Sequence, residues 1–218
     1  MALAIFDLDE TLIAIDSDHA WGQYAIDRGL VDAEEHQHQN DQFYADYKRG
    51  ELNINAYLAF TCSMLPAFSI DELDELRKDF ATSVIKPYVL PKAQYLVNQH
   101  RGKNDHLLVI TATNRFIAEP IVDFFHIDTL IAPTPEIQNN QYTGKVLGTP
   151  SYGEGKVTCL NEWIITTKKS MDGSFFYSDS HNDLPLLRMV THPVAVDPDD
   201  ILKKEAENKE WPIISLRS

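Results

Sequence analysis

The sequence predicts an α/β fold in which a parallel sheet forms the core and a wholly helical segment follows the first strand. Short apolar runs alternate with segments of helical periodicity over most of the chain, which is typical of a parallel sheet covered by helices. Between about residues 17 and 86 there are amphipathic helical stripes but no convincing buried strand. We therefore expect a core of residues 1–16 and 87–218, with a helical insertion of residues 17–86.

Each expected strand is a short, continuously apolar run, which is the pattern of a strand buried on both faces. These runs lie at residues 2–6, 107–110, 130–132, 175–177 and 193–196, and an edge strand is expected at 213–216. Helical periodicity is found at residues 92–100, 116–125 and 156–166. Polar and apolar residues alternate around Gly144 at 141–146, next to Asn139 and Asn140, which predicts a small hairpin.

The helical insertion contains several stripes of apolar residues at helical spacing. Trp21 and Tyr24 belong to the first stripe, and Phe43, Tyr44 and Tyr47 form the second. A third stripe covers about residues 56–64, and a fourth helix is expected to start at Ser69, with Glu72 as its capping-box partner. We interpret the aromatic stripes as the apolar core of the insertion.

Composition and charge exclude several classes of protein. The 218 residues include 19 Lys and Arg against 33 Asp and Glu, a formal net charge of −14, which would repel a nucleic acid. The two cysteines, Cys62 and Cys159, cannot form a disulfide framework or a four-cysteine zinc site. No apolar run approaches the roughly 20 residues of a membrane helix, and the N-terminus does not resemble a secretory signal. We expect a cytoplasmic protein without nucleic-acid or membrane partners; its oligomeric state is left open.

Two acidic clusters follow expected strands directly. Asp7 and Asp9 come after the first strand, and Asp179 and Asp183 come after the strand at 175–177. Ligands of open α/β sheets bind beyond the carboxyl ends of the strands, so both clusters are expected at one edge. Neighbouring carboxylates repel each other unless a cation binds between them or one is protonated. Mg²⁺ suits such oxygen ligands, although a single cluster is equally compatible with a solvated acidic turn.

Two further segments could bind an anion at the same edge. The strand at 107–110 leads into Thr111, Ala112 and Thr113, and we expect Thr113 to cap the helix that begins near Phe116. Lys156 follows Gly153 and Gly155, but the surrounding sequence does not match a nucleotide-binding P-loop. A lysine beside the acidic clusters could neutralise a phosphate group.

The order of these motifs resembles the haloacid dehalogenase superfamily. An Asp-x-Asp-x-Thr motif, a strand ending in Thr, a Lys and an Asp-Ser-x-x-Asp motif follow one another over nearly the whole chain. The arrangement is similar to the phosphoserine-phosphatase-like branch, subfamily IB, which implies a Rossmann-like core with an all-helical C1 cap. The second motif is Thr111–Ala112–Thr113, where phosphoserine phosphatases usually show Ser-Gly-Gly, so the resemblance does not fix phosphoserine as the substrate.

The resemblance implies a role for each motif residue. Asp7 would be the nucleophile that becomes an aspartyl-phosphate, and Asp9 would protonate the leaving group and then activate water. The phosphate would be bound by Thr111, Ala112 and Lys156. Mg²⁺ would be bound by Asp7, Asp179 and the backbone carbonyl of Asp9, with Asp183 and Asn182 supporting this site.

The substrate is expected to be a small phosphorylated metabolite. Asp16, Ser17, Asp18 and His19 lie where the chain enters the insertion and could contact the leaving group. In phosphoserine phosphatases an acidic residue at about the place of Asp16 binds the substrate amine; a hinge or helix-capping role is the alternative for Asp16. Arg49 is a candidate for binding a substrate carboxylate. Phosphoserine and histidinol phosphate are two candidate substrates. A phosphotransferase with the same intermediate, or a catalytically silent cation-binding module, is the alternative to a Mg²⁺-dependent phosphatase.

Overall fold

The computed structural model describes residues 2–217 and contains the predicted parallel α/β core. Its main sheet has six strands in the order β3-β2-β1-β6-β7-β8, and every neighbouring pair is parallel. These strands are β1 (Leu3–Phe6), β2 (His106–Ile110), β3 (Thr129–Ile131), β6 (Phe175–Ser178), β7 (His192–Val196) and β8 (Ile213–Ile214). All the predicted strands are confirmed, although the edge strand β8 is shorter than expected.

Helices cover both faces of this sheet because alternate residues of each strand point to opposite faces. The helices of the core are α5 (Pro91–Gly102), α6 (Arg115–Val122), α7 (Glu154–Thr167), α8 (Leu184–Leu187) and α9 (Asp200–Asn208). Leu3 and Ile5 of β1 belong to one buried apolar cluster, together with residues of α7, α8 and α9. Ala4 and Phe6 belong to a second cluster, which includes residues of α5 and α6.

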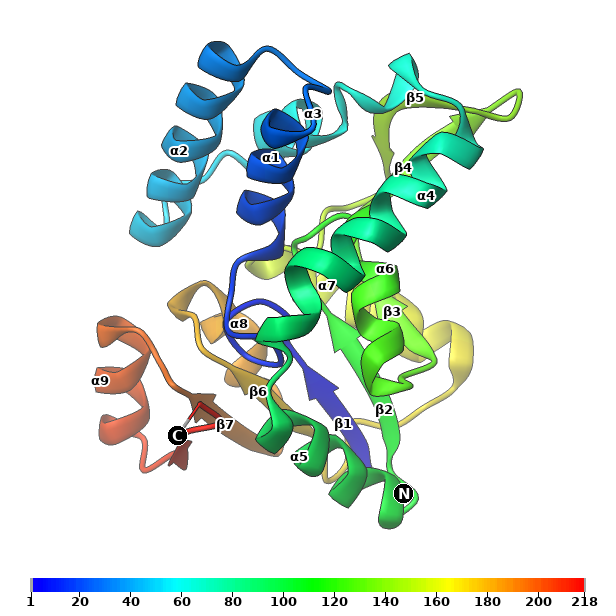
Figure 1. Cartoon of the computed structure of the whole chain (residues 1–218). Helices are drawn as coiled ribbons and strands as arrows, with labels where there is room; N and C mark the ends of the chain where they lie inside the picture. The colour runs from blue at the N-terminus through cyan, green and yellow to red at the C-terminus, as the bar shows by residue number, and fades with distance from the viewer. Residues whose placement is uncertain (1, 218) are drawn as a thin grey trace.

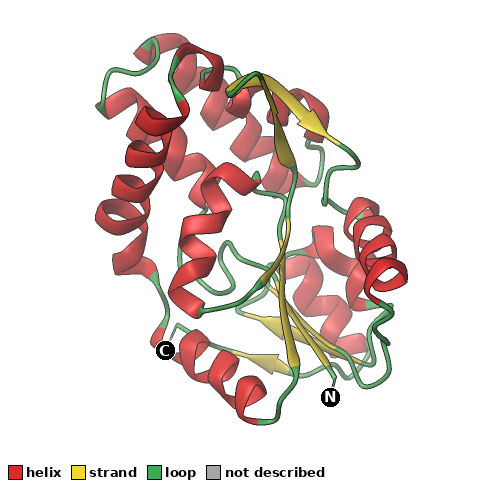
Figure 2. Cartoon of the chain, turned by 90° about the vertical axis from the view of Figure 1, so that its right-hand side faces the viewer, coloured by secondary structure: helices red, strands yellow, loops and turns green. Residues whose placement is uncertain are grey.

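The predicted insertion is helical throughout and lies beyond one end of the sheet (Figures 1 and 2). It consists of α1 (Ser17–Asp27), α2 (Ala33–Arg49), α3 (Ile54–Cys62), the short turn η1 (Leu65–Ala67), α4 (Ile70–Phe80), and the π-helical and 3₁₀ turns η2 (Ala81–Ile85) and η3 (Lys86–Tyr88). Asp16, Asp32 and Asn53 cap α1, α2 and α3. The strands of the main sheet are not interrupted by the insertion, which packs on the α6 side of the core through the T-shaped pair Trp21–Phe116.

The predicted hairpin is also present, but it packs with the helical insertion. Strands β4 (Thr134–Gln138) and β5 (Gln141–Leu147) are antiparallel, and Asn139 and Asn140 both have positive φ, as a tight hairpin turn requires. Pro66 lies 3.3 Å from where a Cβ on Gly144 would be placed, and Gln141 donates a hydrogen bond to the Pro66 carbonyl. The hairpin therefore connects α3 and η1 to the core (Figure 1). It lies outside the bounds of residues 17–86 that the sequence predicts for the insertion.

The helices give no indication of a membrane-spanning segment. Within residues 2–217, none of them combines the length and the apolar character that crossing a bilayer requires.

We predict that Ser69→Ala destabilises the insertion through the loss of an N-cap. The Ser69 hydroxyl accepts a hydrogen bond from the backbone N–H of Glu72, and the Glu72 carboxylate accepts one from the backbone N–H of Ser69. Loss of such a cap costs about 1 kcal/mol, which corresponds to a Tm decrease of about 2–4 °C in a chain of this size. Thermal unfolding followed by circular dichroism measures it.

Ser83→Ala is the matched control. The Ser83 hydroxyl donates to the carbonyl of Asp79 within a helix, and such a bond adds little to helix stability. Equal Tm changes in the two variants would contradict the capping assignment.

Candidate active site

The predicted acidic clusters meet at the carboxyl edge of the sheet, below the helical insertion. Asp7 follows β1 directly and Asp179 follows β6, and these two strands are hydrogen-bonded neighbours. Asp183 ends a short 3₁₀ turn, η5 (His181–Asp183), four residues after Asp179. Because β1 and β6 end side by side, Asp7 is brought next to Asp179 and Asp183, which are distant from it in the sequence.

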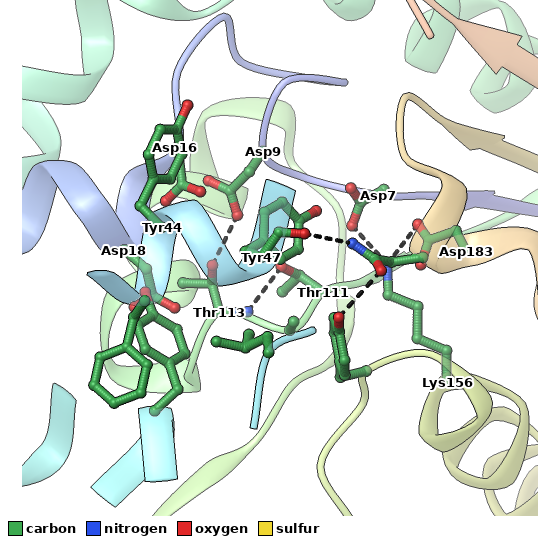
Figure 3. A pocket seen from close by; sticks show the side chains of 16 residues that line it. Asp7, Asp9, Asp16, Asp18, Tyr44, Tyr47, Thr111, Thr113, Lys156 and Asp183 are labelled. Atoms are coloured by element: carbon green, nitrogen blue, oxygen red, sulfur yellow. Dashed lines mark hydrogen bonds and ion pairs between the residues drawn. The ribbon is translucent and has the colours of Figure 1, made fainter. Parts of the chain in front are cut away.

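Lys156 joins two of these carboxyls. Its ammonium donates to Asp7 at 2.8 Å and to Asp183 at 2.7 Å, and the lysine is only 3% exposed (Figure 3). Gly155 permits this position, because a Cβ there would lie 2.0 Å from the carbonyl oxygen of Pro150. The tight approach of this loop thus places Lys156 on the first turn of α7, facing the strand ends.

Burial changes the acidity of the carboxyls around Lys156. Burial raises the pKa of Asp7 to about 7, against the attraction of Lys156. It also raises the pKa of Asp179 well above its usual range, and the charges of Asp7 and Asp183 add to this rise. One lysine therefore does not neutralise the cluster, and an additional cation would stabilise it.

Asp9 has a different set of partners from Asp7. Its carboxyl oxygens accept hydrogen bonds from the backbone N–H of Ser17 and from the Thr113 hydroxyl, each at 2.7 Å. Burial raises the pKa of Asp9 to about 6, and the nearby charge of Asp16 adds to this rise. The carboxyl of Asp9 is thereby directed toward the insertion, while that of Asp7 is directed toward Lys156 (Figure 3).

The prediction that Thr113 caps the next helix is wrong. Asn114 is the N-cap of α6, where its side chain accepts a hydrogen bond from the backbone N–H of Ile117. The Thr113 hydroxyl is bonded to Asp9 instead, and the Thr113 backbone N–H donates to the hydroxyl of Thr111. The N-cap lies one residue later than predicted, so Asn114 caps the helix while Thr113 binds Asp9. Sequence alone does not resolve a shift of one residue at a helix start.

The structure gathers most of the predicted site residues around one cavity. Its lining includes the predicted residues Asp7, Asp9, Asp16, Thr111, Ala112, Lys156, Asn182 and Asp183. Asp179 lies beside this group, where it accepts a hydrogen bond from Thr11. Arg49 does not line the cavity: its exposed side chain is paired with Asp46 and Glu51 at the end of α2.

Sequence analysis assigned several aromatic residues to the core of the insertion that in fact line the cavity. These residues are Phe43, Tyr44 and Tyr47 of α2. Tyr57 and Tyr152 also line it, and neither was singled out from the sequence. Trp21, by contrast, is 2% exposed and packs in the core as expected. A helix between a core and a cavity has two apolar faces, which periodicity does not distinguish.

The insertion touches the core on both sides of this cavity. Asn182 of the core donates to the carbonyl of Tyr47 and accepts from the hydroxyl of Tyr152. On the other side, Asn114 donates to Asp18 at 3.4 Å. Gly50 ends α2 with positive φ, and a Cβ there would lie 2.7 Å from Nε2 of His181. The cavity therefore lies between the insertion and the strand ends.

The residues present fit Mg²⁺ in number and kind. Asp7 and Asp179 offer two carboxylates, and Asp9, whose backbone carbonyl could be the third ligand, is two residues from Asp7 in the sequence. Mg²⁺ commonly takes one or two carboxylates and completes its coordination with waters and substrate phosphate oxygens. No cluster of three or more His, Cys, Asp or Glu side chains arranged around a metal position is found within residues 2–217. A site with two carboxylates and one carbonyl is consistent with that observation.

Comparison with known proteins gives a family match over most of the chain. The model of the haloacid dehalogenase-like hydrolases matches residues 4–188. A histidinol-phosphatase of Neisseria meningitidis is 48% identical over 219 residues, which cover 99% of each chain.

Solved structures agree with this match. The crystal structure of a protein with unknown function from Bordetella pertussis is 38% identical, with a TM-score of 0.92 over 99% of this chain and 98% of that one. A substrate-bound phosphoserine phosphatase is 16% identical, with a TM-score of 0.71 over 99% of this chain and 93% of that one, and this similarity concerns the fold.

We predict that Lys156→Met destabilises the protein in a pH-dependent way. The change leaves the carboxyls of Asp7 and Asp183 buried without their cation, which costs about 3–5 kcal/mol of unfolding free energy. The Asp7 pKa is already raised to about 7 and should rise further. A group with a raised folded-state pKa favours folding as the pH falls, so the penalty should shrink between about pH 8 and about pH 6.

Urea denaturation at several pH values measures this penalty. Lys92→Met is the control, since Lys92 is exposed on α5. A penalty that does not change with pH, or that equals the control's, would show that the carboxyls are not left charged and unpaired.

Proposed function

This chain belongs to the haloacid dehalogenase-like hydrolases and is a phosphatase of small phosphorylated molecules, and we propose that it hydrolyses its substrate through an aspartyl-phosphate on Asp7 with the help of Mg²⁺. The observation that carries the proposal is that the carboxyls of Asp7 and Asp9 have different hydrogen-bond partners. Lys156 binds one carboxyl, and Thr113 and Ser17 bind the other. Two carboxyls on one loop are thereby prepared for different roles.

Asp7 is the proposed nucleophile. Its carboxylate oxygen forms a bond to phosphorus as the ester P–O bond breaks, which gives an acyl phosphate and an alcohol. A covalent intermediate splits one difficult displacement into two easier ones. The ammonium of Lys156, at 2.8 Å from Asp7, reduces the repulsion between the carboxylate and the incoming phosphate.

Asp9 is the proposed acid and base. In the first step the Asp9 carboxyl gives its proton to the leaving alkoxide. In the second step the Asp9 carboxylate takes a proton from water, and the water oxygen attacks phosphorus and releases inorganic phosphate and free Asp7. Such proton transfer contributes about 10²- to 10⁴-fold to the rate. The pKa of Asp9, raised by burial to about 6, suits a group that must both give and take a proton.

Mg²⁺ would be bound by Asp7, Asp179 and the carbonyl of Asp9. When bound, it supplies positive charge that offsets the carboxylates and the phosphate oxygens during transfer. The Thr11 hydroxyl donates to Asp179 at 3.2 Å and accepts from the Asp179 backbone N–H at 3.1 Å. These two hydrogen bonds hold the Asp179 carboxylate at the carboxyl end of β6. Asp183 and Asn182 support the site by binding Lys156 and the insertion, respectively.

The substrate that we propose is histidinol phosphate. The relative that is 48% identical is named for this activity. The cavity supports the choice: Arg49 lies outside it, and the one basic side chain among its described lining residues, Lys156, is bonded to Asp7 and Asp183. A substrate carboxylate, such as that of phosphoserine, would find no unpaired cation among these lining residues. Histidinol phosphate has no carboxylate and needs no such cation. The proposed roles leave no reason to retain the silent cation-binding module as a function.

We predict that phosphatase activity depends on Mg²⁺. EDTA should abolish hydrolysis, and excess Mg²⁺ should restore it. Mg²⁺ should also raise the Tm of the protein without substrate, because a ligand that binds only the folded state stabilises it by mass action. Asp179→Asn should shift both responses to higher Mg²⁺ concentrations. Full activity in EDTA would contradict the metal assignment, and phosphate transferred to added alcohols in place of free phosphate would indicate a phosphotransferase.

We predict that Asp7→Asn and Asp9→Asn fail at different steps. Asp7→Asn should form no phosphoenzyme with any ester. Asp9→Asn keeps the nucleophile, so it should still react with 4-nitrophenyl phosphate, whose leaving group needs little protonation, while losing about 10²- to 10⁴-fold on an alkyl ester. Rapid acid quenching with both esters measures the phosphoenzyme. Its formation in Asp7→Asn would place the nucleophile elsewhere.

A further inference from the structure

The half of the cavity that faces the insertion is lined by acids and aromatic rings. This half, called here the leaving-group half, comprises Asp16, Asp18, Phe43, Tyr44, Leu52 and Tyr57. In Figure 3, Asp16 and Asp18 lie on the opposite side of Asp9 from Asp7, Lys156 and Asp183. A phosphate near Lys156 would therefore extend its alcohol group past Asp9 into this half.

Asp18 has partners that leave its charge uncompensated. The side chain is buried, with 4% of the residue exposed; it accepts a hydrogen bond from Asn114 and interacts with the side chain of Tyr57. None of these groups is a cation. Burial raises the pKa of Asp18 well above its usual range, and the charges of Asp16 and Asp9 add to the rise. A positively charged group that entered the cavity would be the counter-ion that this carboxyl lacks.

The two basic residues at the end of α2, Lys48 and Arg49, do not neutralise Asp18. Lys48 is exposed, lies 5.2 Å from the ring centroid of Tyr44, and acts on Asp16, whose pKa its charge lowers against the larger effect of burial. Arg49 is engaged by Asp46 and Glu51. Asp16 and Asp18 thus have different surroundings, although they are two residues apart.

Asp16 and Asp18 have different neighbours in this half of the cavity. The charge of Asp16 adds to the raised pKa of Asp9, the proposed acid. Asp18 interacts with Tyr57, whose ring centroid is 5.3 Å from that of Phe43. Two rings that line a cavity next to a carboxyl suit a planar cationic ring, which can contact π faces and donate a hydrogen bond.

We propose that Asp18 is a specificity-determining residue that accepts a hydrogen bond from a planar, nitrogen-bearing ring at the far end of the leaving group. The inference rests on the proposed function and adds to it the class of substrate: phosphate monoesters of amino alcohols that carry a cationic or N–H-bearing ring and no carboxylate. A carboxylate in this half would face two acids.

The test uses three esters that differ in the amine and the ring of the leaving group. Histidinol phosphate, the ester proposed above, has both the amine and the imidazole; 2-amino-3-phenylpropyl phosphate replaces the imidazole by a phenyl ring; and 4-nitrophenyl phosphate lacks the amine and the imidazole. Asp18→Asn should lower kcat/KM for histidinol phosphate by about 10- to 100-fold, mainly through KM, and change it for the other two esters by less than about threefold. The wild type should prefer the imidazole ester over the phenyl ester by a similar factor.

Asp27→Asn is the matched control, since Asp27 is an exposed acid at the C-terminal end of the same helix α1. It should leave all three esters unchanged. A role of Asp18 in folding alone would lower activity on all three esters equally, and that result, or no loss at all, would overturn the inference. If Asp18→Asn does not fold, equal wild-type rates on the imidazole and phenyl esters would still overturn it. A wild-type enzyme that hydrolyses none of the three esters with Mg²⁺ would instead overturn the proposed function, and this inference with it.

Discussion

The structure depends on the buried ion pairs that Lys156 makes with Asp7 and Asp183. Each carboxyl follows, or lies close after, a strand of the parallel sheet, so the fold itself concentrates negative charge at one edge. Removing one partner of a buried ion pair costs far more unfolding free energy than removing one partner of an exposed pair. The same lysine that makes this cluster compatible with folding is the one that we propose binds the phosphate. Stability and the proposed chemistry therefore draw on one group, and a change at Lys156 is expected to affect both.

The helical insertion adds selectivity to this charged edge without contributing to the sheet. Its helix α1 brings Asp16 and Asp18 next to Asp9, and its helix α2 supplies the aromatic wall of the cavity. Asn182 and Asn114 bond the insertion to the core on either side. In the function that we propose, the phosphate is bound by the core and the leaving group by the insertion, so the reaction and the choice of substrate would reside in separate parts of the chain.

Sequence analysis predicted the sheet and the location of the acidic clusters because these depend on short-range patterns. The buried run before Asp7 and the one before Asp179 each specify a strand end, and parallel pairing then brings the two acids together. The bonding of Thr113 to Asp9 could not be predicted, since the helix start is uncertain by a residue. The position of Tyr57 against Asp18 depends on how two helices pack, which no local pattern contains. The docking of the β4–β5 hairpin on α3 is likewise a tertiary contact between distant segments.

The central claim is that hydrolysis proceeds by two successive displacements at phosphorus, the first by a protein carboxylate. The stereochemical course of the reaction tests it most directly. A phosphorothioate ester whose phosphorus is made chiral with two oxygen isotopes can be hydrolysed in water enriched in the third, and the configuration of the released thiophosphate, which then carries three different oxygen isotopes, can be determined. Each in-line displacement inverts the configuration, so two displacements predict overall retention. Overall inversion would show that water attacks the ester directly, and would contradict the account.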